Sequence, residues 1–99
     1  MRITHSAKME VAEAADWYET RRAGLGFEFV DAVQTAVLAI EADPTRYARL
    51  ETNRTDRKVH RYLLKRFPYV VIYEFRPDEI VLLSVAHARR RPDHWIKRG

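Results

Sequence analysis

Hydrophobic side chains recur at helical spacing through the first half of the chain. Following residue 6, apolar residues return every three or four positions, at Val11, Ala14, Ala15 and Tyr18. From about Phe27 to Ala42, the same spacing is formed by Phe29, Val33, Ala36, Val37 and Ile40. Side chains three or four positions apart share one face of an α-helix, so the pattern predicts two amphipathic helices.

Local signals suggest where these helices begin and end. Ser6 is the expected N-cap of the first, because its hydroxyl can accept a hydrogen bond from a first-turn amide. Gly24-Leu25-Gly26 interrupts the pattern, and Pro44 follows the second helix. An antiparallel helical hairpin should result. Its first helix should expose the acidic residues that lie off the apolar stripe: Glu10, Glu13, Asp16 and Glu19.

The second half is rich in β-branched and aromatic residues, which favour strands. Strands are predicted at Met1–His5, Arg57–Phe67, Val70–Tyr73 and Ile80–Val85. The segment 76–79 is too short for a crossover helix, so the last two strands should pair as an antiparallel hairpin. We therefore predict one domain, residues 1–99, of the α+β class. Its order is β-α-α-β-β-β, with an antiparallel sheet packed against an N-terminal helical hairpin.

Composition indicates a soluble globular protein, with 46% hydrophobic and 32% charged residues. No run of 18 apolar residues and no secretory signal is present, and the chain lacks cysteine, so we expect a cytoplasmic protein that does not enter membranes. The four histidines lack the spacing of a zinc protease, and Gly24-Leu25-Gly26 lacks the lysine of a phosphate loop. We therefore expect no metal and no cofactor.

Charge is distributed unevenly along the sequence. Residues 1–53 contain six basic and nine acidic residues, a balance of −3, whereas residues 54–99 contain twelve and five, a balance of +7. A basic half of this kind can attract nucleic acid or an acidic protein segment. Charge alone does not choose between these partners.

Alternation along the strands suggests how the basic residues are grouped. Every second residue of a strand shares a face, which would place Val81, Leu83, Val85 and His87 together. Arg61 and Lys65 should likewise share a face of the preceding strand. If Arg61, His87 and Arg89 converge, they could hold a phosphate and transfer a proton. The alternative is that Arg89, Arg90 and Arg91 form a solvated surface run that binds only an acidic protein segment.

Several motifs in the second half resemble a known family. They are FPYVVIYEF, which contains Phe67-Pro68-Tyr69, and EIVLLSVAHARRRPDHW, in which His87-Ala88-Arg89-Arg90 precedes Pro92 and Trp95. Their order and spacing resemble the RelE/ParE superfamily of small toxins from bacterial type II toxin–antitoxin pairs. The resemblance extends over nearly the whole chain and implies that the helices pack on one face of the sheet.

The resemblance implies a function as well as a fold. The chain is most similar to the ParE-like branch of plasmid-stabilisation toxins, which implies inhibition of growth and neutralisation by a cognate antitoxin protein in a hetero-oligomer. DNA gyrase is then the favoured target, and the protein would not itself be an enzyme. The alternative on the same fold is a ribosome-dependent messenger-RNA endonuclease of the RelE type. A third possibility is a non-toxic binding module.

Candidate site residues follow from the same comparison. Family ribonucleases use Lys and Arg residues on the sheet, often with a C-terminal Tyr, where this chain has Trp95, which cannot act as acid or base. If the protein is a ribonuclease, the catalytic candidates are His87, Arg61 and Arg89. Residues expected to bind the target or the antitoxin are Arg61, Lys65, Arg89, Arg90, Arg91 and Trp95.

The aromatic residues have structural alternatives. Trp17 and Tyr18 could face a partner, but we favour Tyr18 in the core with Trp17 at its edge. Pro92 and Trp95 are similarly interpreted as a clasp that pins the C-terminal tail to the sheet, with Trp95 as its anchor.

Overall fold

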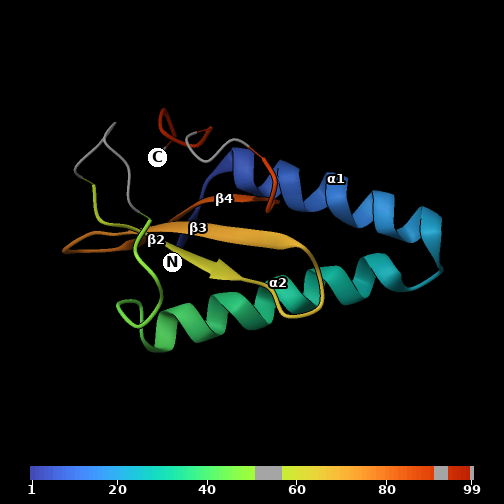
Figure 1. Ribbon diagram of the computed structural model, residues 1–99, viewed down its shortest axis with the longest axis horizontal. Coiled ribbons are helices and arrows are strands. Elements are labelled where there is room, and N and C mark those ends of the chain that lie inside the picture. Colours follow the sequence, from blue (N-terminus) through green and yellow to red (C-terminus); the bar gives the residue numbers. More distant parts are fainter. Residues whose placement is uncertain (51–56, 91–93, 99) are drawn as a thin grey trace.

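The computed structural model describes residues 1–50, 57–90 and 94–98. The elements are β1 (Arg2–Ile3), α1 (His5–Arg21), α2 (Leu25–Ala42), β2 (Val59–Leu63), β3 (Tyr69–Phe75) and β4 (Ile80–His87) (Figure 1). The α+β class and the predicted order are confirmed. The predicted boundaries are less accurate: β2 is shorter at both ends, β3 begins one residue earlier and ends two residues later, and β4 ends two residues later.

In the described part of the chain, the strands form one sheet in the order β1-β4-β3-β2. Both predicted antiparallel neighbours are present, since β3 pairs antiparallel with β2 and with β4. However, β1 runs parallel to β4, so the sheet is mixed rather than wholly antiparallel. The partner of β1 lies more than 75 residues away along the chain, and such a long connection permits either direction.

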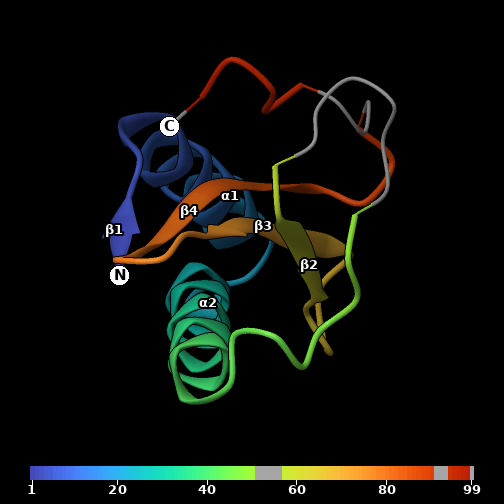
Figure 2. The same ribbon diagram turned by 90° about the vertical axis from the view of Figure 1, so that its left-hand side faces the viewer.

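Both helices pack on one face of the sheet and form the main core with it (Figures 1 and 2). The predicted stripes are confirmed: Ala14 is buried in α1, and Phe29, Val33, Ala36 and Ile40 are buried in α2. Tyr18 packs against an aromatic group of Phe29, Phe67 and Tyr69, whereas 51% of Trp17 is exposed. The favoured placement of these two aromatic residues is therefore confirmed.

The helix boundaries differ from the sequence prediction. Thr4, not Ser6, caps α1, because its Oγ1 accepts a hydrogen bond from the Ala7 amide at 3.2 Å. Gly24 ends the turn with a φ of +88°, a conformation that favours glycine. Gly26 lies inside α2, where an added Cβ would come within 2.5 Å of the Ala15 carbonyl oxygen. The second glycine therefore permits close packing of the helices rather than linking them.

A second, smaller core lies on the opposite face of the sheet, beneath the C-terminal residues 94–98, which we call the tail segment (Figure 2). Trp95 is fully buried there against side chains from three strands: Val59, Val70, Ile72, Val81 and Leu83. The Arg57 guanidinium lies 5.5 Å from the centre of the Trp95 ring. The predicted clasp is confirmed for Trp95, whereas Pro92 lies outside the described residues.

A β-bulge interrupts the alternation of β4. Tyr73 pairs with Leu82 and Ile72 with Ser84, so Leu83 is an extra residue. One extra residue moves the following side chains to the other face. Leu83 consequently packs with Trp95, whereas Val85 belongs to the helix-side core. The expectation that Val81, Leu83, Val85 and His87 share one face is therefore wrong.

Candidate functional site

Glu10 of α1 is the centre of a polar network beside the bulge. Its Oε1 accepts hydrogen bonds from the Val85 amide at 3.1 Å and the Ser84 hydroxyl at 3.0 Å. Two arginines donate to the same carboxylate, Arg98 to Oε1 and Arg90 to Oε2, each at 2.8 Å. Only 12% of the Glu10 side chain is exposed. The prediction that it lies in solvent is wrong, because α1 packs against β4 along this side.

This network holds the tail segment against the sheet. Arg98 donates to the Leu83 carbonyl oxygen as well as to Glu10, both through Nη1. The Ser84 hydroxyl contacts His94 Nε2 at 2.7 Å. Glu10 thus links α1, β4 and the tail segment. No feature of the sequence distinguishes it from Glu13, which is exposed one turn further along.

A second carboxylate anchors the same face of the sheet. Glu74 Oε1 accepts from Arg57 at 2.7 Å and from Arg76 at 2.9 Å. Burial alone would raise the pKa of Glu74, but the hydrogen bonds from the two guanidinium groups outweigh it and lower the pKa. Arg57 also donates to the Ile96 and Arg98 carbonyl oxygens, so this pair stabilises the tail segment too.

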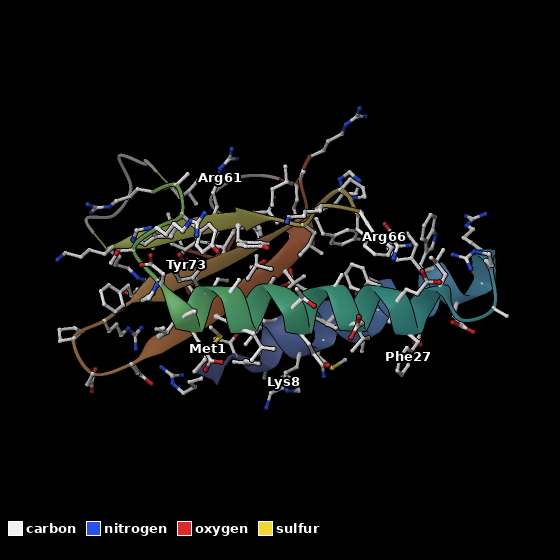
Figure 3. The ribbon with its side chains drawn as sticks, turned by 90° about the horizontal axis from the view of Figure 1, so that it is seen from below. Met1, Lys8, Phe27, Arg61, Arg66 and Tyr73 are labelled. Atoms are coloured by element: carbon white, nitrogen blue, oxygen red, sulfur yellow. The ribbon has the colours of Figure 1, made fainter. Side chains whose placement is uncertain are left out.

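A cavity of about 70 Å³ lies between the sheet and three residues beyond β4: Ala88, Arg90 and His94. Its apolar lining includes Val70, Ile72 and Ala86, and four basic or titratable side chains complete it: Arg61, His87, Arg90 and His94. We call it the basic cavity. Arg61 is exposed and points away from the helices (Figure 3). Within the described part of the chain, no carboxylate lies within 4 Å of its guanidinium.

The predicted catalytic residues are only partly brought together. Arg61 and His87 both line the basic cavity, but Arg89 is not among its lining residues. The Arg89 amide donates to His87 Nδ1 at 3.2 Å, which leaves Nε2 to carry the hydrogen of a neutral ring. The His87 imidazole also packs on Tyr69 in a T-shaped arrangement, with 5.5 Å between ring centres.

The remaining predicted binding residues have different environments. Lys65 lies beyond the end of β2 and lines a cleft with Glu28 of α2, so it does not share a face with Arg61 as expected. Trp95 is fully buried, which leaves it no surface for a target or an antitoxin. Arg90 is paired with Glu10, whereas Arg89 is exposed. Arg91 lies outside the described residues.

Two larger hollows border α1. One, of about 600 Å³, runs between α1 and the end of β4, where Trp17, Tyr69 and His87 line it. The other, of about 480 Å³, separates α1 from α2 and is largely apolar; its lining residues include Ile3, Val11, Val30, Val37 and Leu38. We call the second the helical groove. Both volumes are within the range of sites that bind ligands or partner segments.

The part of the chain that the structure describes contains no group of three His, Asp or Glu side chains able to hold a metal ion. Nor does it contain a helix both long and apolar enough to cross a membrane.

A helical hairpin on one face of a small mixed sheet, with the tail segment pinned to the other face, defines the chain as a small α+β protein. The model of one family, the ParE toxin of the type II toxin–antitoxin system parDE, matches residues 1–92. The chain belongs to this family.

Solved structures agree with this fold. The chain is similar to a structure described as the chromosomal ParDE TA system from P. aeruginosa, with a TM-score of 0.64 and 18% sequence identity. The similarity covers 87% of this chain and 91% of the other. At this level of identity the match concerns the fold alone. None of the curated proteins matches the sequence significantly.

Proposed function

We propose that the protein is an active toxin that a cognate antitoxin neutralises and that acts on DNA gyrase. The observation that carries this proposal is the match of the ParE toxin family over residues 1–92. The test is expression in a bacterial host, which should arrest growth, with rescue when the antitoxin encoded beside it is co-expressed. A well-expressed chain that is harmless would instead favour the non-toxic binding module.

The helical groove supports binding of an antitoxin. Its lining is predominantly apolar, and Lys8 lies at it beside Val11. Leu38 lines the same groove, although 68% of its surface is exposed. An amphipathic segment can insert apolar side chains into such a groove while its acidic residues meet nearby cations. Leu38→Glu should therefore weaken the complex with the antitoxin while leaving the toxin folded.

Gyrase as the target requires a direct test. Expressing cells should accumulate broken DNA that is covalently linked to gyrase, together with a DNA-damage response. Purified gyrase should form the same cleavage complexes when the toxin is added. If growth stops without such complexes, the gyrase target is wrong although the chain remains a toxin.

The basic cavity supports one alternative, a ribosome-dependent messenger-RNA endonuclease. Arg61 and His87 line it together with His94, and a histidine near neutral pH can move a proton. A general acid or base typically contributes about 10²–10⁴-fold to a rate. In a ribonuclease His87→Gln should therefore abolish codon-positioned messenger cuts, whereas a gyrase poison should retain much of its toxicity.

A further inference from the structure

We propose that the basic cavity binds one phosphate group of a nucleic-acid backbone. This inference goes beyond the proposed function, because it concerns a contact with nucleic acid that requires neither RNA cleavage nor a particular target. Arg61, Arg90, His87 and His94 supply the polar lining, and the sheet supplies the apolar lining.

Size restricts the occupant. A cavity of about 70 Å³ has room for roughly two water molecules, given about 30 Å³ for each in the liquid. A phosphate or carboxylate oxyanion matches that space, whereas a nucleobase requires far more. The contact should therefore be independent of nucleotide sequence, as is usual for backbone phosphates.

Charge around the cavity favours an anion. Two carboxylates on this side of the sheet each accept from two arginines: Glu10 from Arg90 and Arg98, and Glu74 from Arg57 and Arg76. Arg76 also pairs with Glu79, so among the described residues these four guanidinium groups exceed their three carboxylates by one positive charge. Arg61 adds another, and no carboxylate within the described ranges meets it. The face of the sheet that carries the tail segment is therefore cationic even after its internal pairing.

The lining can donate hydrogen bonds to an oxyanion. Arg61 offers a guanidinium fork that suits two phosphate oxygens. Arg90 is held by Glu10 through Nη1, and its guanidinium has further N–H groups. The neutral ring of His87 carries its hydrogen on Nε2, because Nδ1 accepts from the Arg89 amide. The apolar lining weakens solvent screening and strengthens these contacts.

A polyanion of nucleic acid fits this face better than an acidic peptide does. The cavity itself contributes Arg61 and Arg90, and residues 54–99 as a whole have a balance of +7. A regularly charged backbone can place one phosphate at the cavity while its neighbouring phosphates are attracted by this positive surplus. The alternative that the experiment tests is that the cavity binds a carboxylate of an acidic peptide instead of a phosphate.

The experiment uses the purified full chain and two probes, inorganic phosphate and a short labelled DNA duplex. Phosphate, titrated at constant ionic strength, should shift the NMR signals of residues that line the cavity. Arg61→Gln should weaken duplex binding about tenfold, as expected for a hydrogen bond to a charged group. The same substitution should also make the dependence of binding on salt less steep. In a plot of the logarithm of the association constant against the logarithm of the salt concentration, the slope should decrease in magnitude by about 0.9.

Two further variants keep the test decisive. Arg46→Gln removes the same charge from an exposed arginine outside the cavity and should leave the salt slope unchanged. Arg61→Lys retains the charge but not the planar guanidinium that can bond two oxygens. This variant should therefore bind the duplex more weakly while the salt slope stays unchanged. Equal effects of Arg46→Gln and Arg61→Gln, or no saturable shifts with phosphate, would overturn the proposal. So would a polyglutamate peptide of equal charge that displaces the duplex from the cavity at lower concentration.

Because binding is measured without gyrase, ribosomes or growth, the two proposals fail separately. A toxin with no phosphate site would still arrest cells, and a phosphate-binding chain that is harmless would still give the shifts.

Discussion

Removal of the Glu10 carboxylate should destabilise the protein more than removal of any other acidic side chain of α1. Glu10→Ala removes the carboxylate that accepts from the Val85 amide, the Ser84 hydroxyl and two guanidinium groups, of which Arg98 keeps only the Leu83 carbonyl oxygen on β4. The free energy of unfolding should consequently fall, and the tail segment should lose its main attachment to β4.

The magnitude follows from burial. Removal of one partner of a buried ion pair costs about 3–5 kcal/mol. Arg98 is 18% exposed and approaches that case, whereas Arg90 is 48% exposed and its pair contributes under about 1 kcal/mol. Alanine has a higher helix propensity than glutamate, which offsets the loss of stability by a few tenths of a kcal/mol. We therefore expect a loss of about 2–4 kcal/mol, equivalent to a decrease in Tm of roughly 10–20 °C.

Chemical denaturation monitored by circular dichroism measures this loss. Glu10→Gln retains an acceptor for the Val85 amide and should lose about half as much stability. Glu13→Ala is the matched control, because Glu13 is exposed one turn along α1, and it should change stability by less than about 0.5 kcal/mol. In double-mutant cycles with Glu10→Gln, the coupling energy should be larger for Arg98 than for Arg90. Equal losses in Glu10→Ala and Glu13→Ala would refute this account of the network.

Three other changes test the two cores. Leu83→Ala should lower the free energy of unfolding by about 2–5 kcal/mol, because Leu83 is fully buried at the bulge; an unchanged melting curve would contradict its placement. Trp95→Ala should cost about 3–5 kcal/mol, whereas Trp17→Ala, at a half-exposed position, should cost much less. Burial raises the pKa of Tyr73 to about 12, so the folded state holds this proton more tightly than the unfolded chain does. The resulting stability is present below about pH 10 and is lost between pH 10 and 12. Tyr73→Phe should flatten that alkaline loss in a pH series of melts, at a cost near 1 kcal/mol for its hydrogen bond to the Pro44 carbonyl oxygen.

The elements that the sequence predicts well are those with a local, repeating signal. The apolar stripes of α1 and α2 recur over several turns, and spacing alone predicts the buried positions Ala14, Phe29, Val33, Ala36 and Ile40. The connection at 76–79 is similarly informative, because four residues are too few for a parallel crossover, so β3 and β4 must pair antiparallel. The sequence also predicts Trp95 as an anchor, because a large apolar ring in an otherwise basic segment is stable mainly when it is buried against the sheet.

The elements that the sequence could not predict depend on distant contacts. The bulge at Leu83 has no signature, because Leu82, Leu83 and Ser84 fit an uninterrupted strand equally well. Its consequences are large, since it turns Val85 toward the helices. The parallel direction of β1 and the role of Thr4 are also tertiary outcomes, because Thr4 caps α1 where the chain leaves β1 and is held there by hydrogen bonds to the Leu82 and Leu83 carbonyl oxygens of β4.

The candidate site was predicted in part for the same reason. His87 and Arg61 meet at the basic cavity because β3 brings their two strands to the same end of the sheet. Lys65 was misplaced because β2 ends at Leu63, after which strand alternation no longer applies. The position of Arg89 depends on the turn after His87, where its amide bonds to the imidazole.

The arginines of the second half divide into two kinds, and this division determines how their substitution should be interpreted. Arg57, Arg76, Arg90 and Arg98 are bonded to buried carboxylates, so their loss perturbs the tail segment and the fold before it affects any partner. Arg61 is exposed and, among the described residues, meets no carboxylate, so its loss should leave stability unchanged. Loss of toxicity in Arg90→Ala would consequently not identify a contact with the target unless the melting temperature were preserved. Loss of toxicity in Arg61→Gln at unchanged stability would.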